Sequence, residues 1–218
     1  MSHDIKAFFK GCANGLSELL SNISMSVVSM LYNFQLIKYA GNDGVAAYGV
    51  LMYVNFIFAA VFIGYSVGSA PIVSYHFGAQ HKDEVKNVLR KSIVITGLFS
   101  VAMLVLSQAL ASPLSKVFVG YDAELYSMTV NGFKIFSFSF LFSGIAIFGS
   151  SFFTALNNGI VSALISFSRT AVFQVAAVLI LPIFFELNGI WLSIVVAEIM
   201  SAVISAMMIV GLRKKYGY

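Results

Sequence analysis

Six long apolar segments, separated by short polar connections, set the pattern of the chain. Each segment has the roughly 20 mostly apolar residues that a helix needs to cross the hydrocarbon core of a bilayer. Turn-forming asparagine and glycine residues separate several neighbours, as in GNDG, NNG and ELNG. The pattern predicts an all-α membrane protein, a single membrane domain over residues 1–218, with helices at about 16–39, 45–75, 89–111, 127–156, 161–184 and 190–212.

The longest polar connection covers residues 76–92, between the second and third predicted helices. Its apolar residues Val85, Val88 and Leu89 recur at helical spacing, whereas most of its other positions are polar. We therefore expect a short amphipathic helix here, lying at the membrane surface.

Composition supports lipid rather than water as the main solvent. The 218 residues are 59% hydrophobic and only 10% charged, whereas soluble domains carry roughly 25% charged residues. The 9 acidic and 13 basic side chains are too few to coat a soluble protein of this length. Cys12 is the only cysteine, which excludes an internal disulfide and a cysteine-based metal cluster.

Basic residues predict the orientation of the chain, because Lys and Arg near membrane ends favour the cytoplasmic side. With six crossings, most of them fall on one side and few on the other, so both termini should be cytoplasmic and the protein should lie in the cell (inner) membrane. This clustering in short loops also makes nucleic acid an unlikely partner. The residues on the basic side are Lys6, Lys10, Lys82, Lys86, Arg90, Lys91, Arg213, Lys214 and Lys215.

A polar stripe runs along the first predicted helix. Glu18, Asn22, Ser26, Ser29 and Asn33 are three or four residues apart and therefore share one helix face. One interpretation is that the stripe faces a watery cavity, where Glu18 exchanges a cation or a proton. The other is that the small polar residues pack against a neighbouring helix, with Glu18 at the headgroups.

Arg169 and Glu198 are charged residues within the fifth and sixth predicted helices. At a rise of about 1.5 Å per residue, their depths in the membrane differ by roughly 5 Å or less, which long side chains can span. Because each charge alone would be costly in lipid, we predict an ion pair between the two helices. The pair could be a structural clamp, or a proton-sensitive link that opens when Glu198 is protonated.

Sequence signatures of catalysis are missing. The chain has no GKS-type phosphate loop, no HExxH zinc motif and no GxSxG nucleophile elbow. Its three histidines, His3, His76 and His81, lie in polar flanks of the spans. We therefore predict that the protein is not an enzyme and has no cofactor or bound metal of its own.

Three stretches resemble one transporter family. The run GVAAYGVLMYVNFIFAAVFIGYSVGSAPIVSYHFGA (44–79) is similar to the eighth helix and following loop of multidrug and toxic compound extrusion (MATE) transporters. The run ISFSRTAVFQVAAVLILPIFFELNGIWLSIVVAE (165–198) resembles the eleventh and twelfth helices, and NGLSELLSNISMSVVSMLYN (14–33) resembles the start of the seventh. The resemblance covers nearly the whole chain.

The resemblance implies a fold and an activity. MATE transporters have twelve helices in two six-helix lobes, so this chain would correspond to the C-terminal lobe, its partner being the missing N-terminal lobe or a second copy. The family exports cationic and amphipathic compounds by alternating access, driven by Na⁺ or H⁺. The acidic residue that several members place in the tenth helix is absent from residues 127–156. Glu18 and Glu198 are the remaining coupling candidates, unless coupling depends on the other lobe.

Two other functions stay open at this point. A lipid or glycolipid flippase of the same superfamily would share the fold, although its central cavity is typically more charged than the polar faces here. An inactive fragment or a membrane scaffold is the third possibility, because only one lobe is present.

Overall fold

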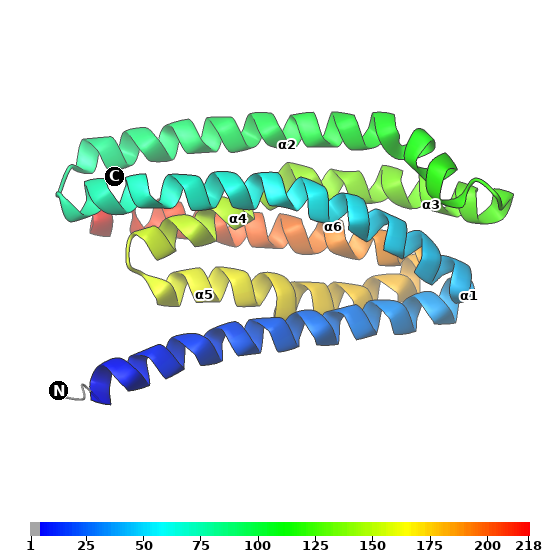
Figure 1. The fold of residues 1–218 in the computed structure, drawn as a ribbon, viewed down its shortest axis with the longest axis horizontal. Coiled ribbons are helices and arrows are strands. Elements are labelled where there is room, and N and C mark those ends of the chain that lie inside the picture. Colours follow the sequence, from blue (N-terminus) through cyan, green and yellow to red (C-terminus); the bar gives the residue numbers. More distant parts are fainter. Residues whose placement is uncertain (1–4) are drawn as a thin grey trace.

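The protein is a bundle of long helices joined by short turns (Figure 1). The computed structural model describes the backbone of residues 5–218 and the side chains of residues 23–218, and it contains no strand in that backbone. The elements, in chain order, are α1 (Ile5–Gly78), α2 (Lys82–Val119), α3 (Ala123–Phe136), the 3₁₀ helix η1 (Ser137–Ser139), α4 (Phe140–Ala155), α5 (Gly159–Phe167), the π-helix η2 (Ser168–Gln174) and α6 (Val175–Tyr216).

Two of these helices reverse direction within their length. Four described stretches are long and apolar enough to cross a membrane: Ile23–Gly78, Lys82–Val119, Ala123–Ala155 and Gly159–Tyr216. If the 56 residues of the first were straight, they would extend about 84 Å, far beyond the roughly 30 Å hydrocarbon core. Instead the chain turns back at Gly41 (φ 61°, ψ −150°) and at Glu186 (φ 49°, ψ −129°).

With these two reversals, the four described stretches make six passes through the bundle. Successive passes run in opposite directions (Figure 1). Both reversals fall in turns that the sequence marks with glycine, 41–44 and 186–189. The predicted all-α membrane architecture is confirmed.

The expected surface helix at 76–92 is wrong as a separate element. After a turn at 79–81, the chain enters α2 at Lys82 and stays helical to Val119. Val85 and Leu89 are buried and continue the same buried face as Ser92 and Thr96 one and two turns later. Because the apolar face of 82–92 is continuous with that of the span, these residues pack into the bundle instead of lying flat on lipid.

The passes pack through two aromatic-rich clusters. One is centred on Phe62, Phe133, Phe136, Phe140 and Trp191, all nearly inaccessible. The second is nearer the end of α6, where aromatic residues from α4 meet those of the C-terminal segment; it contains Phe148, Phe152, Phe153 and Tyr218. The outer surface remains apolar, as expected for a bundle that meets lipid.

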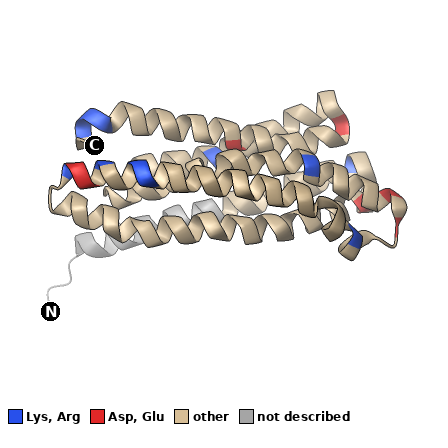
Figure 2. Ribbon diagram, turned by 90° about the horizontal axis from the view of Figure 1, so that it is seen from above, with Lys and Arg blue, Asp and Glu red and all other residues tan. Residues whose placement is uncertain are grey.

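Charged residues gather at the two ends of the bundle (Figure 2). The basic start of α2 and the basic end of α6 come together at one end of the bundle. There Gly217 lies against the side chain of Lys82. Acidic residues Asp122 and Glu124 begin α3, and Asp122 caps that helix by accepting the backbone N–H groups of Glu124 and Leu125. Among the described side chains, Glu198 and Arg169 are charged groups that pair inside the bundle.

A glycine should stabilise the chain at both reversals, so adding one at Glu186 and removing the one at Gly41 should have opposite effects on stability. Glu186 is exposed and adopts a positive φ that glycine takes without strain, so Glu186→Gly should stabilise the chain by about 1 kcal/mol. Gly41→Ala should destabilise it by a similar amount, because alanine resists the backbone conformation at that turn. Thermal unfolding in detergent should register each change as a shift of about 2–4 °C.

Gly49→Ala is the matched control. Gly49 lies in a regular helix with open space around it, so alanine should leave the melting temperature unchanged or raise it slightly. A Gly41→Ala variant as stable as Gly49→Ala would contradict the turn described at Gly41.

Candidate functional site

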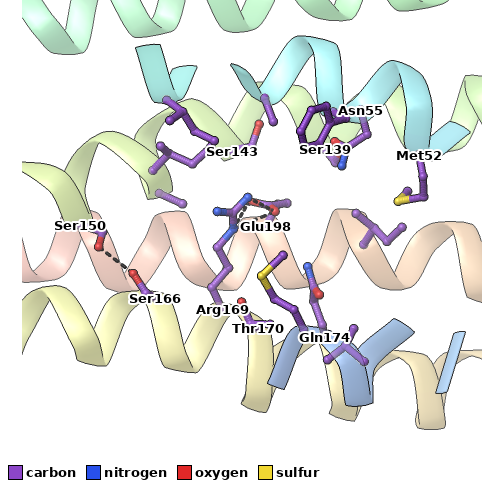
Figure 3. Close-up of a pocket in the computed structure, with 18 of the residues that line it drawn as sticks. Met52, Asn55, Ser139, Ser143, Ser150, Ser166, Arg169, Thr170, Gln174 and Glu198 are labelled. Atoms are coloured by element: carbon purple, nitrogen blue, oxygen red, sulfur yellow. Dashed lines mark hydrogen bonds and ion pairs between the residues drawn. The ribbon is translucent and has the colours of Figure 1, made fainter. Parts of the chain in front are cut away.

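A cavity of about 630 Å³ lies within the bundle (Figure 3). Its described lining comes from α1, η1, α4, α5, η2 and α6, and none of it comes from α2 or α3. Apolar walls are formed by residues such as Met25, Met52, Phe56 and Ile147. Hydroxyl and amide groups interrupt these walls: Ser29, Ser66, Ser139, Ser143, Ser150, Ser151, Ser166, Asn55, Thr170 and Gln174.

Arg169 and Glu198 form an ion pair in this cavity, and among the described side chains they are its only charged lining groups. The guanidinium Nε donates to both carboxylate oxygens of Glu198, at 2.9 Å and 3.1 Å, and Nη2 donates to Oε1 at 2.7 Å. The Glu198 side chain is 4% exposed and that of Arg169 is 26% exposed. The pair therefore neutralises a buried carboxylate, while one edge of the guanidinium stays accessible from the cavity.

A π-helix carries the arginine into the cavity. Residues Ser168–Gln174 adopt the wider π geometry between α5 and α6, and Arg169, Thr170 and Gln174 from this segment line the cavity. Figure 3 shows Arg169 reaching from this segment across to Glu198 on α6. Short π-helical segments are rare and are frequent at functional sites. The segment SRTAVFQ contains no glycine or proline, so no residue type in it marks the π geometry.

Stacked aromatic side chains form another part of the wall. Tyr32 and Tyr48 stack with ring centroids 5.4 Å apart, and Tyr48 stacks on Trp191 at 6.5 Å. The Tyr32 hydroxyl shares a 2.7 Å hydrogen bond with Ser193, whose hydroxyl also lies 2.6 Å from the carbonyl of Ile190. These contacts hold α1 and α6 together and fix the orientation of the tyrosine rings. The sequence pattern does not distinguish these tyrosines from the other aromatic residues of the spans.

Hydroxyl groups also join α4 to α5 beside the cavity. Ser150 is hydrogen-bonded to Ser162 at 2.9 Å and to Ser166 at 2.7 Å, and Thr154 is bonded to Ser162 at 2.7 Å. Each hydroxyl finds its partner within the protein, as polar groups in a membrane interior require. The network fixes the polar face that these two helices present to the cavity.

The predicted stripe on the first helix is only partly described. Ser29 lines the cavity, whereas the Asn33 amide donates to the carbonyl of Ser29 at 2.9 Å and does not line it. Glu18 and Asn22 lie outside the residues whose side chains are described. A cavity role for Glu18 and Asn22 therefore stays a prediction, and so does a coupling role for Glu198. Within the described side chains, no three metal-ligating residues gather in one place.

Comparisons with known proteins identify relatives over most of the chain. The sequence profile of the MatE family matches residues 19–180. The chain is 24% identical over 198 residues to the multidrug export protein MepA of Staphylococcus aureus (strain MSSA476), and 27% identical over 206 residues to MepA of Staphylococcus saprophyticus. Each match covers 91% of this chain but only 43% of the relative. The chain thus spans less than half the length of these proteins.

Solved structures share the fold. An inward-facing structure of a multidrug resistance MATE family transporter of the MOP superfamily matches with a TM-score of 0.84 at 19% identity, over 92% of this chain and 47% of that one. An outward-facing structure described in the same terms matches with a TM-score of 0.83 at 18% identity, over 93% and 45%. The fold of this bundle therefore corresponds to a little less than half the length of each of these solved chains.

Breaking the Arg169–Glu198 pair from one side should destabilise the protein. Glu198→Gln leaves the arginine charge without its partner, which should cost about 3 kcal/mol, near the lower end for buried pairs because Arg169 is partly exposed. The charge-swapped double variant Arg169→Glu/Glu198→Arg should recover much of the loss. Folded yield and thermal unfolding in detergent measure both effects.

Glu124→Gln removes an exposed carboxylate as the control and should leave yield and melting temperature unchanged. Failure of the double variant to recover any stability over the single variants would count against a direct ion pair.

Proposed function

Because the chain belongs to the MatE family, whose members are transporters rather than enzymes, we propose that it is one six-helix lobe of an exporter of cationic or amphipathic compounds. The observation that carries this proposal is the cavity of about 630 Å³. Most of its wall is apolar, several hydroxyl groups face it, and its described lining has no net charge. A cavity with these properties accepts an apolar body together with a few polar groups. The multi-pass membrane architecture supports the same function.

Several wall residues suit varied substrates. Tyr32 and Tyr48 give the wall a rigid aromatic patch, because their rings stack on each other and Tyr48 also stacks on Trp191. Met25 and Met52 are unbranched and polarisable, so they adapt to ligands of different shape. The single ion pair leaves no fixed net charge in the described lining. This neutrality favours drug-like amphipathic compounds over a lipid or glycolipid with a charged headgroup.

Transport would require a second lobe. The relatives named multidrug export protein MepA are more than twice as long as the matched region, which supports the need for a second lobe. This bundle resembles inward-facing and outward-facing structures almost equally, with TM-scores of 0.84 and 0.83. The similarity to both supports alternating access by movement of an intact lobe against its partner.

Coupling to Na⁺ or H⁺ would act through an acidic residue. In our proposal Glu198 is one such group, because a proton or cation on its carboxylate competes with Arg169 for the same oxygens. Loss of the pair would leave the arginine charge uncompensated and favour a different packing of η2 on α6. Glu18 is the second candidate. No resident cofactor enters this scheme.

Export of ethidium tests the proposed function. The chain should be expressed in cells alone, and together with any six-helix segment encoded upstream of its reading frame. Efflux by the chain alone would indicate a homodimer, and efflux only with the second segment would indicate a split transporter. Glu198→Gln should abolish coupled efflux in whichever arrangement is active, whereas Glu124→Gln should not. Absence of efflux in both arrangements, with the chain folded in the membrane, would contradict the proposal.

We further propose that both termini face the cytoplasm in the inner membrane, since the basic ends of α2 and α6 come together at one end of the bundle. In a Cys12→Ser background, Tyr121→Cys at the opposite end should react with a membrane-impermeant maleimide on intact cells. Lys214→Cys should react only after permeabilisation. The reverse labelling pattern would contradict this orientation.

A further inference from the structure

A second concave surface lies at the basic end of the bundle, between the start of α2 and the end of α6. It encloses about 350 Å³ and is separate from the central cavity, with which it shares no residue. Three basic residues line it, Lys86 and Arg90 from α2 and Arg213 from α6. The rest of its lining is apolar: Leu89, Ile93, Val94, Ile209, Val210 and Tyr218. We call these nine residues the basic groove.

Polarity changes along the groove. Lys86 and Arg90 lie in the first turns of α2, and the exposed Ile93 and Val94 follow one to two turns deeper in the bundle. On α6 the order is mirrored, because Val210 precedes Arg213 by one turn and is 73% exposed. Cations therefore stand at the end of the bundle and exposed aliphatic side chains lie farther inward. A phospholipid has the same arrangement, with a charged headgroup at the interface and acyl chains below it.

The three cations are available to an external anion. Among the described side chains, the only ion pair is Arg169–Glu198, so Lys86, Arg90 and Arg213 have no Asp or Glu partner there. Arg213 is held in place because its Nε donates to a backbone oxygen of Tyr218 at 2.9 Å. That bond uses one donor and leaves both terminal amino groups of the guanidinium free to bind a headgroup.

The side chain of Tyr218 forms the floor of the groove beside these cations. Its hydroxyl donates to the carbonyl of Ile209 at 3.1 Å, and its ring packs edge-on against Phe152. Burial and the neighbouring Tyr216 raise the pKa of Tyr218 to about 12, so its hydroxyl carries no negative charge at neutral pH.

We propose that the basic groove binds an anionic phospholipid, with its phosphate held by Lys86, Arg90 and Arg213 and its acyl chains along Ile93, Val94 and Val210. The proposal commits to a lipid because a free phosphate would leave the apolar part of the groove unused. Basic pockets between helix ends at the membrane surface commonly hold such headgroups. The site is independent of the proposed transport activity, since α2 does not contribute to the described lining of the central cavity.

Native mass spectrometry of the full chain in detergent tests the proposal. Titration with phosphatidylglycerol should give a bound lipid at lower concentration than titration with phosphatidylcholine of the same acyl chains. The triple variant Lys86→Gln/Arg90→Gln/Arg213→Gln should lose this preference, with a weakening of about five-fold for each charge removed. All three side chains are exposed, so the variant should keep the wild-type melting temperature.

The matched control removes three other charges from the same end of the bundle. Lys82→Gln/Lys91→Gln/Lys214→Gln has the same net charge as the groove variant, but none of these residues lines the groove. It should retain the preference for phosphatidylglycerol. Equal loss in both variants would show only a diffuse surface potential and would overturn the proposal. Displacement of the lipid by millimolar inorganic phosphate would overturn it too, in favour of a small-anion site.

Discussion

A peptide group inside hydrocarbon finds no water to bond with, so the backbone within a bilayer must satisfy its own hydrogen bonds. The described chain does so with helices, and its two reversals, at Gly41 and Glu186, fall at ends of the passes. The π-helix Ser168–Gln174 is an irregular stretch within the bundle, and it lies beside the cavity. Irregular backbone at membrane depth is tolerated where it borders such a cavity, so the place of η2 and the place of the cavity are linked.

Several polar side chains around the cavity meet the same requirement. Arg169 and Glu198 satisfy each other through three hydrogen bonds, and hydroxyls such as those of Ser150 and Tyr32 find partners on neighbouring helices. These bonds cross between α1, α4, α5 and α6, the helices that surround the cavity. Polar groups therefore hold together the part of the bundle that a substrate would contact. A change in the ionisation of the pair would therefore alter how η2 packs on α6.

Much of the fold was predictable because each span and each turn depends on a short stretch of the sequence. Glycine-containing turns marked both reversals, and equal depth in adjacent spans was enough to bring Arg169 and Glu198 together. Other features depend on which helix faces meet. Tyr32 and Tyr48 are two aromatic positions among many, and their spacing does not distinguish a lipid-facing ring from one that lines a cavity. Nor does any residue type in 168–174 encode the π geometry, which arises from packing.

The outer helix α2 has a separate role from the rest of the bundle. It packs on α1, α3 and α4 and supplies half of the basic groove, yet the described wall of the central cavity contains none of its side chains. Its lipid-facing surface can therefore diverge to suit bilayers of different thickness or charge without altering which compounds the cavity accepts. In the proposed transporter, lipid binding and substrate selection therefore fall to different helices, and evolution can tune them separately.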